Sequence, residues 1–264
     1  MSFCHLGCLT QARLLPNVLR YRVALTSRSL PPPLGRGKGA VHMGKRIAVV
    51  APLFCIAVGL VIFTAMDYLR SNPPTINFAA GHKPGQTVDL TLQTVGTIGF
   101  GTHPTWVSYL TLAPDGKWVH TTLWDVPAHT LVHFTIFQYD TGSPLRNQFL
   151  GHVLGTVGGT MTLNGKTISL VNSNNGNGVA HTFTIPTLGI DVPLWGNPST
   201  SKNLCGAAPC TTKYAHNVVT FSVMTPGVGQ YPWQCFIPCG LGYLYGNGGP
   251  MQSIGYMDGF LKVV

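Results

Sequence analysis

The residues best suited to chemistry lie near the C-terminus, in the run YPWQCFIPCG over residues 231–240. Cys235 and Cys239 stand four positions apart there, and Met257 follows just before a closing apolar run. Thiolate and thioether sulfurs suit Cu(I) and other soft metals, and a nearby imidazole completes such a site. His181, at the start of an alternating run, offers that imidazole. The combination predicts a soft-metal site at the end of a strand.

A disulfide between Cys235 and Cys239 is the competing interpretation, because a tight loop can close such a bond where its geometry fits. Cys205 and Cys210 form a second pair, in a loop rich in Gly, Pro and Ser between two expected strands. On the oxidising side of a membrane a local disulfide is the favoured state for that pair. We therefore predict a Cys205–Cys210 disulfide, and for the other pair metal binding and a disulfide both stay open.

The elements that must position these residues are β-strands. Alternating polar and apolar residues run over 87–95, 118–124 and 130–137, separated by turn signals such as Pro-Asp-Gly and Asn-Gly. No amphipathic helical pattern of useful length follows residue 70. This pattern predicts an all-β domain, a sandwich or barrel, rather than a fold of alternating strands and helices.

An apolar stretch before this domain predicts one membrane helix. Residues 47–66 are 20 residues without a charge, which is long enough to span a bilayer. Lys and Arg residues flank its N-terminal side, so the N-terminus is expected in the cytoplasm and the C-terminal domain outside. A cleaved signal peptide is the alternative, but the run is long and no small-residue cleavage site follows it. We expect a single-pass anchor over residues 43–70, a linker over 71–84 and an extracytoplasmic domain over 85–264.

Residues 1–42 resemble neither the anchor nor the domain. They are rich in Arg, Pro and Leu without a steady period, and Met43-Gly-Lys-Arg is a typical opening for an anchor segment. We expect either a short cytoplasmic tail or a miscalled start, with translation beginning at Met43.

The distribution of charge excludes several classes of function. The formal net charge is +9, but from residue 71 onward seven Lys and Arg face six Asp, and the chain has no Glu. No basic patch for nucleic acid follows from this balance. The sequence also has no P-loop, dinucleotide fingerprint or hydrolase elbow, and a glycosidase carboxylate pair has little support.

Three segments resemble the copper A domain of cytochrome c oxidase subunit II and, more broadly, the cupredoxins. They are HTFTIPTLG at 181–189, the Pro-Gly turn and Cys loop at 225–240, and DVPAHTLVHFTI at 125–136. The resemblance covers roughly residues 120–264, with longer loops than the family usually carries. It implies a cupredoxin-like Greek-key β-sandwich preceded by the one membrane helix.

The resemblance also implies a set of copper ligands. Cys235 and Cys239 would be bridging thiolates, His181 an imidazole ligand, the Ile237 carbonyl a weak oxygen ligand and Met257 the axial thioether. One or two copper ions would be the cofactor.

One family ligand is missing from the sequence. Tyr243 stands where the family has its second imidazole, and the expected methionine falls at Gly246. Met251 is an extra soft ligand in this expanded loop, and His103, on a loop, is a remote source of the imidazole. A two-copper centre is therefore one ligand short, whereas a single copper suits two thiolates, one imidazole and one thioether.

The leading expectation is a membrane-anchored extracytoplasmic cupredoxin that binds copper and passes single electrons. Its partner would be a redox protein or a respiratory membrane complex such as an oxidase, and it would be an electron-transfer or accessory protein rather than an independent enzyme. The alternatives are a copper-free structural module with a Cys235–Cys239 disulfide, and a Cu(I) carrier.

Overall fold

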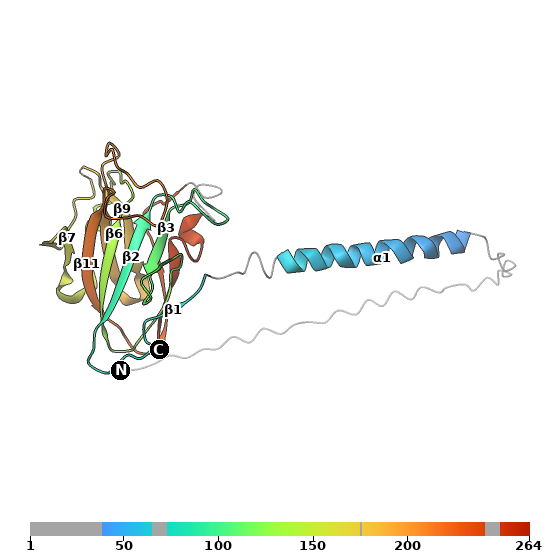
Figure 1. Cartoon of the computed structure of the whole chain (residues 1–264), viewed down its shortest axis with the longest axis horizontal. Coiled ribbons are helices and arrows are strands. Elements are labelled where there is room, and N and C mark those ends of the chain that lie inside the picture. Colours follow the sequence, from blue (N-terminus) through green and yellow to red (C-terminus); the bar gives the residue numbers. More distant parts are fainter. Residues whose placement is uncertain (1–38, 65–72, 175, 241–248) are drawn as a thin grey trace, which may run out of the picture. The chain divides into compact units, whose positions relative to one another are not determined.

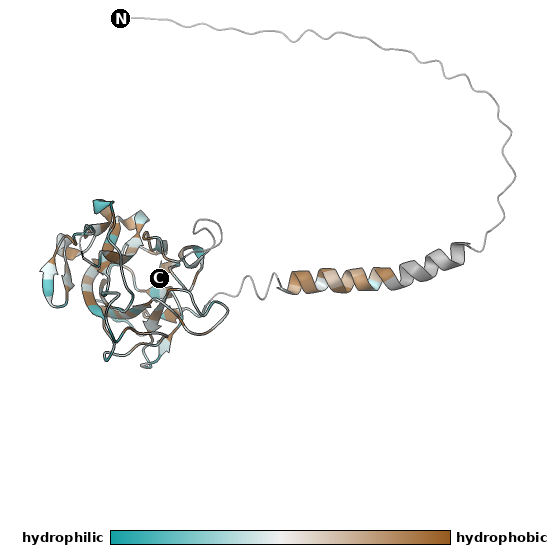
Figure 2. Ribbon diagram, turned by 90° about the horizontal axis from the view of Figure 1, so that it is seen from above, coloured by the Kyte–Doolittle hydropathy of each residue, from teal (hydrophilic) through white to brown (hydrophobic). Residues whose placement is uncertain are grey.

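The computed structural model describes residues 39–64, 73–174, 176–240 and 249–264. The chain divides after residue 64 into a helical unit and a β-rich unit, which are described separately. The helix α1 (Gly39–Phe63) has Pro52 inside it, and its large apolar side chains between Val50 and Phe63 are exposed. Figure 2 shows that much of this part of the helix is hydrophobic. Within the described residues, no helix combines the length and apolar character needed to cross a membrane. The anchor over 43–70 stays a prediction, and its last six residues lie outside the described residues.

The strands of the described residues from 73 onward form two β-sheets. One sheet has the order β1 (Ile76–Asn77), β5 (Leu123–Val126), β13 (Asp258–Val263), β12 (Gly229–Gln234), β9 (Val179–Ile185), β10 (Ile190–Trp195). The other has the order β4 (Trp118–Val119), β3 (Ser108–Leu112), β2 (Val88–Val95), β6 (Leu131–Gln138), β11 (Asn217–Met224), β7 (Met161–Leu163), β8 (Lys166–Ile168) (Figure 1). Short 3-10 helices lie at η2 (Gln148–Gly151), η3 (Val157–Gly159), η4 (Pro186–Leu188) and η5 (Pro250–Gln252). The predicted all-β class is confirmed.

The core lies between the two sheets, and alternation along the strands explains it. In β6 and β11 every second side chain is buried, so each strand gives one face to the core. Phe134 of β6 stacks on Phe221 of β11 and also contacts Phe183 of β9, in the other sheet, at a ring distance of 4.9 Å. Apolar side chains from both faces are thereby removed from water, the main stabilising term of a sandwich.

The structure corrects two details of the predicted elements. The alternating run 118–124 is two strands in different sheets, because β4 pairs with β3 whereas β5 pairs with β13. Thr122 lies between them and donates its hydroxyl to the Asp258 carbonyl at 2.7 Å, which fixes this crossing. Ile76, expected in a linker, is buried and lies in β1, which pairs in parallel with β5. The sandwich therefore starts at Ile76 rather than at residue 85.

Neighbouring strands bring distant parts of the sequence to one end of a sheet. β12 pairs with β9 on one side and with β13 on the other. Cys235 directly follows β12, and its N–H donates to the carbonyl of Met257, directly before β13, at 3.0 Å. His181 lies in β9. Strand pairing thus assembles the residues that the sequence singled out.

Candidate metal centre

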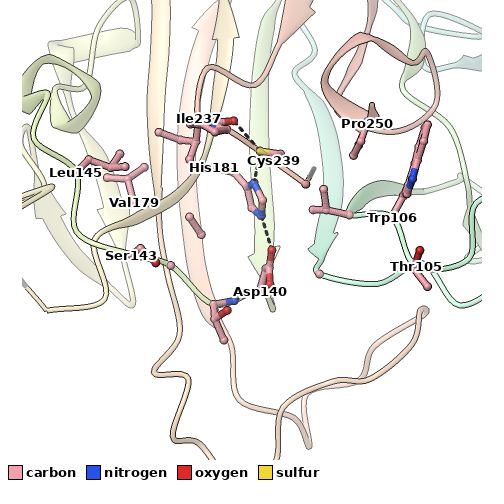
Figure 3. A pocket seen from close by; sticks show the side chains of 17 residues that line it. Thr105, Trp106, Asp140, Ser143, Leu145, Val179, His181, Ile237, Cys239 and Pro250 are labelled. Carbon is pink, nitrogen blue, oxygen red and sulfur yellow. Dashed lines mark hydrogen bonds and ion pairs between the residues drawn. The ribbon is translucent and has the colours of Figure 1, made fainter. Parts of the chain in front are cut away.

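His181, Cys235 and Cys239 converge on one point. Their ligand atoms all lie within 4.8 Å of one another, and all three side chains are buried. Nδ1 of His181 is 3.0 Å from Sγ of Cys239 (Figure 3). The two Sγ atoms are 3.0 Å apart, and the same Nδ1 is 3.9 Å from Sγ of Cys235. One imidazole nitrogen therefore faces both sulfurs, as a shared ligand position requires.

Both cysteines of this site are free thiols. Sγ of Cys235 also accepts the backbone N–H of Thr182 at 3.4 Å, a bond that favours the thiolate. The competing disulfide between Cys235 and Cys239 is not formed in this structure. By contrast, Cys205 and Cys210 are joined by a disulfide, the pairing that the sequence predicts.

The weaker predicted ligands lie around the same sulfurs. The Ile237 carbonyl is 2.9 Å from Sγ of Cys239 and 3.6 Å from Sγ of Cys235. Sδ of Met251 accepts the N–H of Cys239 at 3.3 Å. Met257 is fully buried, and its backbone carbonyl accepts the N–H of Cys235 at 3.0 Å. The structure thus brings all six predicted ligand residues into one neighbourhood.

The missing imidazole does not appear among the described residues. His103 stacks on Trp106 at a ring distance of 3.8 Å, and the close group of metal-ligating atoms found in the described residues does not include it. Tyr243 and Gly246 lie outside the described residues, and the run LGYLYGNG over 241–248 contains no His, Cys, Met or Asp. The donor set is one imidazole and two sulfurs, with Ile237, Met251 and Met257 as weaker donors.

Sequence reasoning missed Asp140, which contacts the other imidazole nitrogen. Its Oδ2 lies 2.9 Å from Nε2 of His181, and Asp140 follows the end of β6 by two residues. The available signal is the scarcity of acids, since the domain has only six Asp and no Glu. A carboxylate at a strand end in such a chain is a candidate for a specific contact.

Electrostatics around the cysteines favour an imidazolium–thiolate pair in the metal-free protein. Burial opposes protonation of His181, but the hydrogen bond to Asp140 and the thiolate of Cys235 outweigh it and raise its pKa to about 9. Burial likewise opposes ionisation of Cys235, but hydrogen bonds from Cys239 and His181 lower its pKa well below the usual value. Burial and the neighbouring thiolate raise the pKa of Cys239. Cys235 is therefore the thiolate of the pair, and a metal held between the two sulfurs would require Cys239 to lose its proton as well.

A second polar chain supports the cysteine loop from the other side. The N–H of Phe236 donates to Oγ1 of Thr182 at 2.9 Å, and Oγ1 of Thr184 lies 2.8 Å from that oxygen. Thr184 also bonds Oδ1 of Asp191 at 2.6 Å. Burial raises the pKa of Asp191 to about 6. The loop is thus tied to buried side chains of β9 and β10, which limits its movement.

Tyr109 has a buried hydroxyl without a hydrogen-bond partner in the described part of the chain. The side chain as a whole is fully buried. Burial, together with the charge of Cys235 and Cys239, raises the pKa of Tyr109 well above its usual value. A buried polar atom without a partner is a feature that needs an explanation, such as an additional bound species.

A cavity of about 570 Å³ opens beside the site. His181, Cys239 and Asp140 line one wall, and Trp106 and Pro250 lie across from them (Figure 3). Cys235 does not line it and is fully buried. The site is therefore approached from the side of Cys239.

Comparisons with known proteins give a limited result. No protein-family model matches the sequence, and no curated protein matches it. Among solved structures, rusticyanin from Thiobacillus ferrooxidans is similar at 17% identity and a TM-score of 0.30, over 74% of this chain and 88% of that chain. A further structure of the copper protein rusticyanin has 16% identity and a TM-score of 0.27, over 78% and 94%. Reduced rusticyanin has 16% identity and a TM-score of 0.26, over 72% and 84%. TM-scores of this size do not define a shared fold.

Proposed function

We propose that this chain is a cupredoxin-like protein that binds copper at His181, Cys235 and Cys239 and passes single electrons. The observation that carries the proposal is the convergence of three buried ligand atoms, two of them free thiol sulfurs, within 4.8 Å. Thiolate and imidazole are the ligands that copper prefers in electron-transfer sites.

The donor set supports one copper ion rather than two. In the described residues a single imidazole lies with the two sulfurs. Residues 241–248, which lie outside the described residues, include no His, Cys or Met. Bound copper would supply a one-electron redox couple. The chain holds the ligands on paired strands and on a loop tied down by Thr182, which keeps their positions similar in both oxidation states.

Burial supports electron transfer over copper carriage. Cys235 and His181 are almost without exposed surface, whereas a carrier must present its ligands to those of a partner. The free state of Cys235 and Cys239 supports metal binding over a purely structural module.

We also propose that the domain works outside a membrane, anchored by the segment over 43–70 and serving a redox protein or a respiratory membrane complex. The Cys205–Cys210 disulfide supports an oxidising compartment. The exposed apolar side chains of α1, such as Phe54 and Val61, support contact with lipid.

The decisive experiment compares the full-length chain in detergent with a Cys235→Ser/Cys239→Ser variant. Total thiols are counted in unfolded samples of each protein. Separate folded samples receive Cu(II) or Cu(I), and their reactive thiols and visible spectra are then measured. We expect two more reactive thiols in the original chain, their protection by copper, and visible thiolate-to-copper absorption that the variant lacks. Reversible bleaching by a one-electron reductant completes the prediction.

Two results would count against this function. Equal thiol counts in the two proteins would mean that the sulfurs are oxidised in the natural chain and would favour the structural module. Copper bound without colour and without reversible redox would favour the carrier.

A further inference from the structure

We propose that Asp140 is a positioning residue that fixes the tautomer and orientation of His181 for metal binding. The inference rests on the proposed function, because it concerns how the same site holds its ion. It adds a role for Asp140, which is not one of the proposed copper ligands.

The contact geometry defines the role. Oδ2 of Asp140 lies 2.9 Å from Nε2 of His181, so the carboxylate accepts the proton of that nitrogen. The opposite nitrogen, Nδ1, lies 3.0 Å from Sγ of Cys239. A neutral imidazole with its proton on Nε2 has its lone pair on Nδ1, directed at the sulfurs. Asp140 therefore selects the tautomer that a metal between the imidazole and the thiolates needs.

The backbone of Asp140 is held firmly in place. The side chain of Gln138 bonds both its N–H and its carbonyl, each at 3.3 Å. Asn197 donates to the same carbonyl from its backbone at 2.9 Å and from its side chain at 3.2 Å. Both amide side chains are buried, so these bonds are shielded from competing water. A side chain on such a support holds its partner at a fixed distance.

Space for the carboxylate depends on a glycine. A Cβ added at Gly96 would lie 2.4 Å from Oδ1 of Asp140 and 2.9 Å from its Cγ. Gly96 does not have the positive φ that would require glycine for conformational reasons. The N–H of Thr141 also donates to Oδ1 at 2.7 Å. The absence of a side chain at Gly96 thus creates the room that the carboxylate occupies.

The test measures Cu(I) affinity of the full-length chain by competition with a chromophoric chelator. Asp140→Ala should weaken binding by about 10–100-fold, the usual effect of losing a carboxylate behind a metal-bound imidazole. Asp140→Asn should lose less, because its amide oxygen still accepts the Nε2 proton. Gly96→Ala should lower the affinity without touching Asp140 itself, by displacing the carboxylate. Gly206→Ala, where a Cβ meets nothing within 4 Å, is the matched control and should leave affinity unchanged.

A second measurement separates a loss of His181 orientation from a general loss of folded structure. ¹⁵N NMR of the Cu(I) form should show the proton of His181 on Nε2 in the original chain and a mixture of states in Asp140→Ala. Tryptophan fluorescence checks that each variant is folded. If Asp140→Ala and Gly96→Ala bind copper as tightly as the original chain with the same tautomer, the inference is wrong while the proposed function stands. If the original chain binds no Cu(I), both are wrong.

Discussion

The β-rich unit contains two cysteine pairs of nearly equal spacing in opposite states. Cys205 and Cys210, five positions apart, are bonded in a loop between β10 and β11. Cys235 and Cys239, four positions apart, are free and lie at the end of β12. Spacing alone therefore does not decide whether a pair forms a disulfide.

The neighbours of the sulfurs explain the difference. The sulfurs of the bonded pair lie near the carbonyl of Ala207, at 3.2 and 3.9 Å. The sulfurs of the free pair contact an imidazole and a backbone N–H, from His181 and Thr182. Donors of this kind stabilise a thiolate, which is the form that binds a metal. The surroundings of the second pair therefore suit the cation that we propose, whereas the first pair forms a disulfide.

The largest effect should be on bound copper, when a variant without one cysteine pair is compared with a variant without the other. Cys235→Ser/Cys239→Ser should reduce bound copper from about one ion per chain to almost none, because both strong sulfur donors are lost. Cys205→Ser/Cys210→Ser should keep the copper and its absorption, since those sulfurs lie outside the close ligand group. Copper per chain after gel filtration, with the visible spectrum, measures both. Equal copper loss in the two variants would remove the distinction between the pairs.

A smaller effect should appear in the pH dependence of stability. Asp191, which is linked to the loop of the free pair through Thr184 and Thr182, can ionise. The pKa of Asp191 is raised from 3.8 to about 6, so the folded state binds its proton more tightly than the unfolded state. Its contribution to stability is complete below pH 3.8 and is lost as the pH rises through 6. Relative to Asp191→Asn, the original chain should lose on the order of 2–3 kcal/mol across that window.

Urea unfolding at several pH values measures this loss. All five tryptophans lie between residues 106 and 233, so fluorescence reports on the β-rich unit alone. The Cys205→Ser/Cys210→Ser variant is the control and should follow the same pH dependence as the original chain. Parallel curves for the original chain and Asp191→Asn would show that Asp191 does not ionise in this window.

The sequence singles out the three residues that converge in the structure, because their types and local patterns carry the information. Soft donors in a short loop, and an imidazole in an alternating strand, identify Cys235, Cys239 and His181. The alternating run expected over 130–137 is also found as a strand, at Leu131–Gln138. Alternation is a local property, however, and it does not say which sheet a strand joins. That is why the run 118–124 was expected as one strand and is two.

Side-chain contacts between residues far apart in the sequence could not be predicted from local sequence patterns. Asp140 and His181 are 41 positions apart, and Thr184 with Asp191 meet only because β9 and β10 pair. Nothing in the local sequence of Asp140 distinguishes it from a turn residue. The glycine that makes room for it, Gly96, is remote from both partners. Such support depends on tertiary packing, whereas the ligands themselves depend on residue type.

The smallest effect should be the loss of stability when the disulfide-bonded pair is replaced by serine. Cys205→Ser/Cys210→Ser releases a short loop, and the entropy regained by the unfolded chain corresponds to about 2 kcal/mol of stability. The loop is also held by other contacts, since the N–H of Cys210 donates to the buried Gln93 at 2.7 Å. Folding should therefore survive, with a lower urea midpoint and an unchanged slope. Cys235→Ser/Cys239→Ser, compared in the metal-free state, removes no covalent link and should lack this entropic loss. A larger fall in that variant than in the disulfide variant would mean that the free pair stabilises the fold and is not reserved for a cation.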